Sequence, residues 1–146
     1  MENKYCNNYL QAITKGMTSV VTSIDHQDVS LEDFFNILVK KITNLQNNNG
    51  KLIFLGNGAS SAFSNHMALD FSKNGKILAR SLSDSALLTA LSNDYSYENA
   101  MLEFLKIEGA TQQDLVITIS SSGNSPNILN VLSHCKENKI KTYFLS

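Results

Sequence analysis

Short runs of apolar residues, separated by segments of helix length, constrain the fold of this chain more than any other feature. The clearest runs are Leu52–Leu55 and Leu115–Ile119, and weaker ones lie near Ile77–Leu82 and Ile140–Leu145. A short continuous apolar run is typical of a strand that is buried on both faces of a parallel sheet. The β-α-β alternation predicts a three-layer α/β/α sandwich with a parallel sheet and right-handed crossovers. The helices expected between the runs extend from the Gly56–Ser60 loop to about Lys73, over Asp84–Leu91 and Tyr97–Ile107 with Ser92-Asn93-Asp94 between them, and onward from Pro126.

Two further helices are expected ahead of the sheet. Along the first, an apolar residue recurs every three or four positions, which predicts one stripe that faces a core or a subunit interface. Ser30 is placed to cap the second helix, Asp33 suits the helix dipole in its first turn, and Asn47–Gly50 ends it. We therefore expect a single domain over residues 1–146, with N-terminal helices over 1–50 and a β/α core over 51–146. The stripe of the first helix consists of Tyr5, Tyr9, Ile13, Met17, Val20 and Ile24.

Composition narrows the classes of function. The chain of 146 residues has a formal net charge of −1 and no block rich in Lys or Arg, which disfavours direct nucleic-acid binding. The first residues do not form a secretory signal, and no run approaches the roughly 18 apolar residues of a membrane span. Cys6 and Cys135 stand far apart and have the pattern of reduced thiols. These features predict a cytoplasmic protein without a membrane span.

Two of the predicted strands end in loops that suit a ligand, because open parallel sheets bind ligands beyond the carboxyl ends of their strands. The first loop, Gly56–Ser60, has glycines for close backbone approach and precedes a helix whose free amides face it. A tight strand-to-helix turn explains the same residues equally well. The loop fits neither the dinucleotide fingerprint nor the P-loop, so no nucleotide cofactor is expected.

The second loop carries a stronger indication of ligand binding. Ser120, Ser121, Ser122 and Ser125 surround Gly123, immediately before a predicted helix. Phosphate needs several donors that converge from one side, and hydroxyls at a helix N-terminus supply them together with backbone amides. The alternative is a flexible linker in which Ser125 only caps the helix. We interpret the loop as a phosphate site, which requires no basic net charge.

The two loops belong to four motifs that occur in the order and at the spacing of a known family. They are Gly56-Asn57-Gly58-Ala59-Ser60, His66-Met67-Ala68-Leu69-Asp70, Leu91-Ser92-Asn93-Asp94-Tyr95, and Ile119-Ser120-Ser121-Ser122-Gly123-Asn124-Ser125-Pro126-Asn127. From about Lys51 to Ser146, the chain resembles the phosphoheptose isomerases of the sugar-isomerase (SIS) domain superfamily. The resemblance implies a SIS fold and a homotetramer with active sites at subunit interfaces. It also implies interconversion of sedoheptulose 7-phosphate and D-glycero-D-manno-heptose 7-phosphate, an early step toward lipopolysaccharide or other heptose glycans.

The resemblance further implies which residues form the site. Asp70 occupies the position of the family's active-site Glu, so it would be the catalytic base, and His66 with Asp70 would ligate zinc in members that bind zinc. The Ser side chains would hold the phosphate, while the other substrate-binding residues would line the sugar. The implied substrate-binding residues are Asn57, Gly58, Ala59, Ser60, Asn93, Asp94, Ser120, Ser121, Ser122 and Ser125.

The implied chemistry agrees with the residues, with two departures. Moving a carbonyl between adjacent carbons proceeds through an ene-diol, and one carboxylate can act as the base for both proton transfers. His66 and Asp70 are four positions apart and share one helix face. However, Asp70 is one methylene shorter than Glu, and the family's remaining Gln and His lie on a C-terminal helix beyond Ser146. The chain ends one residue after an apolar strand, so we interpret the sequence as a piece that lacks a C-terminal segment, rather than as a chain whose natural end is that strand.

A different class of function also fits these departures. A non-catalytic SIS-domain protein would bind a phosphosugar or a protein partner without turnover. The family also resembles a bacterial replication-initiator-associating protein, which works by protein contact. The altered base favours this alternative, whereas the Ser loop and Asn93-Asp94 favour sugar-phosphate binding. A ligand sensor is a third alternative, although no DNA-binding module is visible.

Overall fold

A computed structural model describes residues 4–146, which form two compact units, one up to Lys41 and the other over Ile42–Ser146. The first unit contains α1 (Lys4–Thr18), β1 (Thr22–Ile24), β2 (Gln27–Val29) and the start of α2 (Leu31–Asn47). The second contains β3 (Leu52–Gly56), α3 (Ala59–Lys73), β4 (Ala79–Ser81), α4 (Ser85–Tyr95), α5 (Tyr97–Ile107), β5 (Leu115–Ile119), α6 (Pro126–Glu137) and β6 (Lys141–Leu145). Within residues 4–146, no helix has both the length and the apolar character that crossing a lipid bilayer requires.

The first predicted helix is shorter than its apolar stripe suggested. It ends at Thr18, and Val20 and Ile24 lie outside it, with Ile24 in an antiparallel hairpin of β1 and β2. The two loop residues, Asp25 and His26, have φ of 50° and 65°, which matches the left-handed turn that connects twisted strands most tightly. The β-branched residues before this turn favour a strand, and this local preference overrides the helical spacing.

The predicted cap of the second helix is confirmed. The Asp33 amide donates to Ser30 Oγ at 3.0 Å, and Ser30 Oγ donates to the Asp33 carboxylate at 2.7 Å. These two hydrogen bonds satisfy an amide of the first turn that has no partner within the helix. The helix then ends as predicted, where Gly50 donates its amide to the Leu45 carbonyl.

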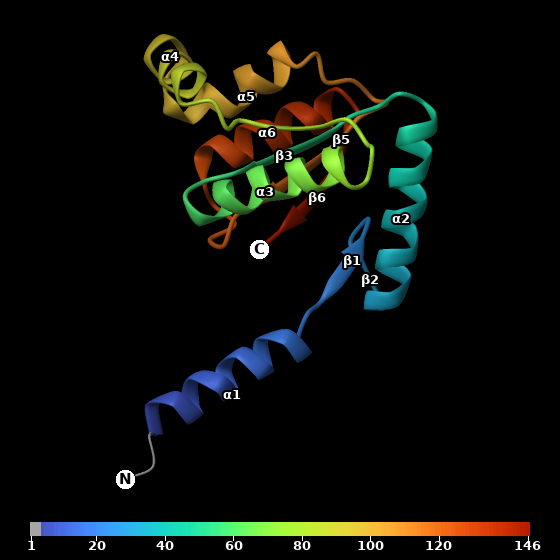
Figure 1. Cartoon of the computed structure of the whole chain (residues 1–146), viewed down its shortest axis with the longest axis vertical. Coiled ribbons are helices and arrows are strands. Elements are labelled where there is room, and N and C mark those ends of the chain that lie inside the picture. Colours follow the sequence, from blue (N-terminus) through green and yellow to red (C-terminus); the bar gives the residue numbers. More distant parts are fainter. Residues whose placement is uncertain (1–3) are drawn as a thin grey trace. The chain divides into compact units, whose positions relative to one another are not determined.

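The second unit is built on a parallel four-stranded sheet with the strand order β4-β3-β5-β6. Figure 1 labels β3, β5 and β6 of this sheet. The central strand β3 is buried along its whole length. Its side chains alternate: Phe54 stacks on Phe71 of α3, whereas Ile53 and Leu55 belong to the core cluster that includes residues of α5 and α6. Helices therefore cover both faces of the sheet, and the predicted three-layer α/β class is confirmed.

Two predicted boundaries within this unit are wrong. The second strand is limited to Ala79–Ser81, because the residues before it form the turn that follows α3. Helix α4 begins after Asp84, which caps it by accepting the Leu87 amide at 2.9 Å. The helix continues through Ser92-Asn93-Asp94 to Tyr95, because these residues do not interrupt it. The break falls at Ser96, whose φ of 75° and ψ of 155° lie in a region that residues other than glycine rarely adopt.

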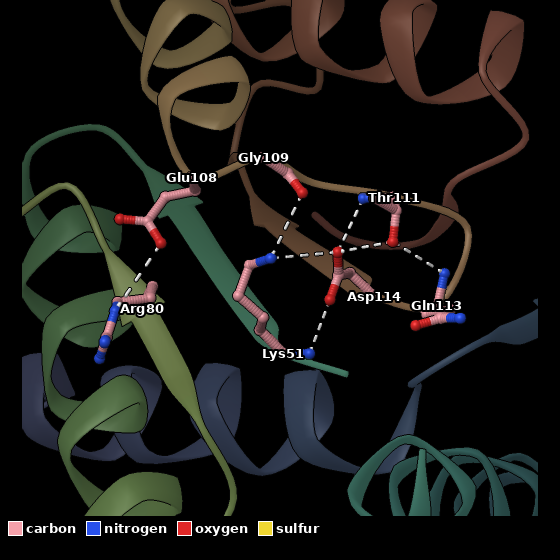
Figure 2. Close-up of polar contacts among 7 residues, drawn as sticks. All are labelled: Lys51, Arg80, Glu108, Gly109, Thr111, Gln113 and Asp114. Carbon is pink, nitrogen blue, oxygen red and sulfur yellow. Dashed lines mark hydrogen bonds and ion pairs between the residues drawn. The ribbon is translucent and has the colours of Figure 1, made fainter. Parts of the chain in front are cut away.

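A buried carboxylate joins the starts of the two central strands (Figure 2). Asp114, which is 4% exposed, accepts the Lys51 amide at 2.7 Å and the Thr111 amide at 2.7 Å. Lys51 Nζ lies 3.3 Å from the same carboxylate. Figure 2 also shows the more exposed ion pair between Arg80 and Glu108 at 3.7 Å. The Asp114 contacts hold the amino ends of β3 and β5 together. They thereby support the register that places the carboxyl ends of the same two strands side by side.

Replacing Asp114 by Ala should lower the free energy of unfolding by about 3 kcal/mol, because two backbone amides and an ammonium lose their buried acceptor. Urea denaturation measures this change. The matched control is Glu137→Ala, which removes an exposed carboxylate that accepts a hydrogen bond from Ser133 Oγ at 3.3 Å and should change stability by less than about 0.5 kcal/mol. Equal losses in the two variants would contradict a special role for Asp114.

The two thiols should differ in reactivity and in their effect on stability at high pH. Burial raises the pKa of Cys135 from 9.0 to about 11, whereas Cys6 is exposed. A thiol reagent at neutral pH should therefore label one Cys in the folded chain and two in urea. Between pH 9 and 11 the unfolded thiol loses its proton while the folded thiol keeps it, so stability should fall by about 1 kcal/mol near pH 10.

The control for this pH effect is Cys135→Ala. Its stability at neutral pH should be lower because a buried side chain is truncated, but its further loss between pH 9 and 11 should be smaller than that of the unmodified chain. Parallel stability profiles for the two proteins would show that the Cys135 thiol is not the group responsible.

Candidate functional site

The two loops predicted from the sequence begin side by side at the carboxyl edge of the sheet. Strands β3 and β5 are neighbours, and their register pairs Gly56 with Ile119, the last residue of each strand. The loop from Gly56 to Ser60 (the glycine turn) and the loop from Ser120 to Ser125 (the serine loop) therefore leave adjacent positions. This edge is where open parallel sheets bind ligands.

The glycine turn requires glycine at two positions for separate reasons. A Cβ on Gly56 would stand 2.7 Å from Cβ of Ser60, so a side chain cannot fit between the strand and the helix. Gly58 has φ of 55° and ψ of −121°, a conformation that disfavours other residues, and it precedes the first residue of α3 without a side-chain cap. The tight-turn interpretation is correct, because the Ser60 amide donates to the Asn57 carbonyl at 3.0 Å. The Ala59 and Ser61 amides of the first turn of α3 have no backbone acceptor within residues 4–146 and can donate to a ligand.

The serine loop is ordered by contacts between its own hydroxyls and amides. Ser120 is 4% exposed, and its Oγ lies 3.2 Å from Ser125 Oγ. Ser122 Oγ accepts the Asn124 amide at 3.3 Å, and Gly123 has φ of 68°. Ser125 stands at the N-cap position of α6 but its side chain makes no capping hydrogen bond. The alternative that Ser125 serves only as a cap is therefore not supported, since its hydroxyl faces Ser120 instead.

Three side chains connect the two loops to α5. Asn57 and Asn127 form a reciprocal pair in which each Nδ2 donates to the other's Oδ1 at 2.9 Å. The Tyr97 hydroxyl also donates to Asn57 Oδ1 at 2.9 Å. Because both lone pairs of Asn57 Oδ1 are then occupied, the amide has a fixed orientation and keeps one N–H as its free polar group. We call these three residues the Asn57 clamp.

The clamp was missed by sequence reasoning. Asn127 falls within the fourth motif but carried no predicted role, and Tyr97 was only the first residue of a predicted helix. The strained backbone at Ser96 immediately precedes Tyr97, and local strain of this kind concentrates at functional positions. No local pattern marks a contact between residues 40 and 70 positions apart along the chain.

His66 and Asp70 lie on one face of α3, as predicted. The His66 Nε2 and Asp70 Oδ2 atoms are 3.2 Å apart, and the two side chains are 65% and 43% exposed. Asn74 Nδ2 also donates to Asp70 Oδ1 at 3.3 Å. Within residues 4–146 no group of three or more His, Cys, Asp or Glu is placed to hold a metal ion. The pair alone does not fit a zinc centre, which usually takes three or four protein ligands, and we derive no chemical step through zinc.

Asn93 and Asp94 lie near the end of α4 rather than in a loop between helices. Both are exposed, and Asn93 Nδ2 donates to Asp94 Oδ1 at 3.0 Å. Ala59 and Ser60 begin α3 beside the glycine turn. The predicted substrate residues thus fall into two groups: those at the adjacent loops of β3 and β5, and this pair on α4.

A parallel α/β sheet with a glycine turn and a serine loop at adjacent carboxyl ends defines an α/β domain with a ligand site at the edge of its sheet. The sequence profile of the SIS domain family matches residues 9–146, and the chain belongs to this family. The phosphoheptose isomerase of Aneurinibacillus thermoaerophilus is 33% identical over 140 residues, which are 92% of this chain and 70% of that protein. A probable phosphoheptose isomerase of Thermoplasma volcanium is 42% identical over 109 residues, or 70% and 55% of the two chains.

Solved structures agree with the fold. A phosphoheptose isomerase of Neisseria gonorrhoeae superposes with a TM-score of 0.78 at 22% identity, over 98% of this chain and 74% of that one. One from Francisella tularensis gives a TM-score of 0.79 at 19% identity, over 99% and 74%. The chain also covers 52% of the protein named phosphoheptose isomerase 2 of Campylobacter jejuni. It therefore spans between about half and 70% of the length of these three curated relatives. The resemblance to phosphoheptose isomerases inferred from the motifs is confirmed.

Proposed function

We propose that this chain is a phosphosugar isomerase that interconverts sedoheptulose 7-phosphate and D-glycero-D-manno-heptose 7-phosphate. The observation that carries the proposal is the adjacency of the glycine turn and the serine loop, joined by the Asn57 clamp, in a chain related to phosphoheptose isomerases. Hydroxyls and free helix amides recognise a phosphate monoester without a fixed positive charge. This agrees with a net charge of −1.

Phosphate binding is assigned to the hydroxyls at the two loops. Ser121 and Ser122 are exposed and free to reach a ligand, whereas Ser120 and Ser125 hold the loop through their mutual contact. The Ala59 and Ser61 amides at the start of α3 and the Asn127 amide at the start of α6 have no backbone acceptor in the described part of the chain and add donors from two helix N-termini. Ser60 belongs to the same set, and Asn57, Gly58 and Ala59 line the sugar, with Asn93 and Asp94 at its hydroxyl end.

Asp70 is the proposed base. In the forward direction its carboxylate takes a proton from the carbon that carries the C1 hydroxyl of the ketose, and the ene-diol forms as the C2 carbonyl oxygen gains a proton. Return of a proton to C2, with loss of the C1 hydroxyl proton, gives the aldose. His66, 3.2 Å from Asp70, is placed to orient the carboxylate or to exchange a proton with it.

Further parts of the proposal rest on the family alone. They are a homotetramer with active sites between subunits, a cytoplasmic location and a role in heptose glycan or lipopolysaccharide synthesis. If zinc binds, His66 and Asp70 would be two of its ligands, and further ligands would have to come from another part of the assembly, because the pair alone does not complete a zinc centre. Size-exclusion chromatography with light scattering tests the tetramer directly: a mass of four chains supports it, and a monomer at micromolar concentration contradicts it.

Binding without turnover is the second candidate, and the shorter carboxylate at position 70 favours it. Misplacement of a catalytic group by about 1 Å can cost on the order of 100-fold in rate. In this case the same site would hold a phosphosugar as a regulatory ligand. The chain would then act as a regulatory protein, for example one that binds a replication initiator.

Calorimetric titration with sedoheptulose 7-phosphate tests the shared part of both candidates. Ser122→Ala removes an exposed hydroxyl of the serine loop and should weaken binding about tenfold, because hydrogen bonds to a charged group contribute roughly 1.5–3 kcal/mol. The control Ser133→Ala removes an exposed hydroxyl on α6 and should leave the Kd unchanged. Equal affinities of Ser122→Ala and the unmodified chain would contradict the assigned phosphate site.

A further inference from the structure

A pocket opens beside the glycine turn, at the carboxyl end of β3, and residues of α3, α4 and α5 line it. Its apolar part is formed by residues of β3, α4 and α5 and by Leu82, and its polar part by residues of the turn and of α3. With a volume of about 90 Å³ it has room for a few non-hydrogen atoms and not for a whole sugar. The residues that line it are Phe54, Leu55, Gly56, Asn57, Gly58, Ser61, Ser64, Asn65, Leu82, Leu88, Tyr97 and Met101.

Two buried polar atoms of this lining lack a partner. Ser64, on the first half of α3, is 1% exposed, and its Oγ makes no hydrogen bond. The Oδ1 atom of the next residue, Asn65, is also buried without a partner. Buried polar atoms in folded proteins are nearly always hydrogen-bonded. Two orphaned atoms on adjacent residues of one pocket therefore indicate that the pocket receives a polar group.

The chemistry of the two atoms restricts the ligand. An amide oxygen only accepts hydrogen bonds, and a serine hydroxyl both donates and accepts. A hydroxyl satisfies both atoms, because it donates one hydrogen bond and accepts another. A phosphate dianion has no proton to donate to Asn65, and an apolar group satisfies neither atom. The pocket is thus complementary to a hydroxyl group, whereas the serine loop is complementary to a phosphate.

Asn57 connects this pocket to the proposed phosphate site. Asn57 lines the pocket, and its side-chain amide pairs with Asn127, which follows Ser125 by two positions. Tyr97 of α5 also lines the pocket, and its hydroxyl donates to Asn57 Oδ1 at 2.9 Å. A ligand that carries a phosphate at one end and hydroxyls along its chain can therefore contact the serine loop and the pocket on the two sides of Asn57.

We propose that Ser64 and Asn65 form a hydroxyl-binding subsite for the polyhydroxy chain of the phosphosugar. This inference rests on the proposed function, because the serine loop must hold the phosphate of the same molecule. The subsite distinguishes sugars by the presence of a hydroxyl at the position that reaches the pocket. It contributes to binding of the sugar and not to binding of phosphate.

Titration calorimetry on the full chain with two probes, sedoheptulose 7-phosphate and inorganic phosphate, tests the subsite. Ser64→Ala removes one orphaned hydroxyl, and Asn65→Leu removes the orphaned amide at similar volume. Each should raise the Kd for the sugar phosphate about five- to tenfold, the range of one lost hydrogen bond, and leave the Kd for phosphate unchanged. Ser133→Ala is the control for both probes, and thermal unfolding shows whether each variant is folded.

The outcomes separate the inference from the proposed function. Failure of the unmodified chain to bind sedoheptulose 7-phosphate overturns the proposed function, and the subsite with it. Normal sugar-phosphate binding by folded Ser64→Ala and Asn65→Leu overturns the subsite alone. Equal weakening for sugar phosphate and phosphate also overturns it, since the substitutions then act on the serine loop.

Discussion

Replacing Asp70 by Asn should lower the rate of hydrogen exchange at the reacting carbons of the sugar by about 10²–10⁴-fold, the usual contribution of a positioned base. The substitution keeps the shape of the side chain but removes its ability to take a proton. Because the Asp70 side chain is 43% exposed and its polar contacts are with the exposed His66 and with Asn74, the melting temperature should change little. NMR of the sugar in D₂O measures the rate.

The matched variant is Asp70→Glu, which retains the carboxylate and restores the length found in the family. Its exchange rate should equal or exceed that of the unmodified chain if the shorter side chain leaves the base too far from the carbon. Affinity for sedoheptulose 7-phosphate should be similar in both variants. An Asp70→Asn protein that exchanges hydrogen as fast as the unmodified chain would show that a different residue is the base.

Loss of the Asn57 clamp should have the second-largest effect. Asn127 is 3% exposed, and its side chain is the reciprocal partner of the Asn57 amide. Asn127→Ala removes this partner from a buried position. We expect a stability loss of about 1–3 kcal/mol, the cost of unsatisfied buried groups. Affinity for sedoheptulose 7-phosphate should fall about tenfold or more, because Asn57 no longer presents its free N–H in a fixed orientation.

Tyr97→Phe provides a milder test of the same clamp. It removes only the hydroxyl that donates to Asn57 Oδ1 at 2.9 Å, and the exposed ring can keep its packing. The melting temperature should be nearly unchanged, while the Kd for the sugar phosphate rises and the Kd for inorganic phosphate stays the same. Equal loss for the two probes would mean that Tyr97 supports the serine loop in general and does not orient Asn57.

Much of the second unit could be predicted because its signals are local. The apolar runs at Leu52–Leu55 and Leu115–Ile119 are long enough to identify buried strands. The glycine turn marks the carboxyl end of the first strand, and the serine loop marks that of the second. The serine loop also follows from a local concentration of hydroxyls. The N-terminal hairpin was missed because the apolar spacing through Ile24 satisfies a helix, and only the Asp25-His26 turn distinguishes the two structures.

The remaining parts of the site depend on contacts between distant segments. Asn57, Tyr97 and Asn127 come from three loops or helix starts, and the chain order gives no sign that they meet. Ser64 and Asn65 stand within an ordinary helical stretch, and their burial becomes evident only when α3 is packed on the sheet. Side-chain orientation at such positions follows from tertiary packing and not from local propensity.

Incubation of the full chain with sedoheptulose 7-phosphate in D₂O, followed by NMR, tests the proposed isomerase activity. We expect deuterium to enter at the carbon next to the carbonyl and the aldose 7-phosphate to appear, because the ene-diol exchanges its proton with solvent through Asp70. Bound sugar phosphate that neither incorporates deuterium nor forms the aldose would contradict isomerase activity of this chain and would leave binding without turnover as its function.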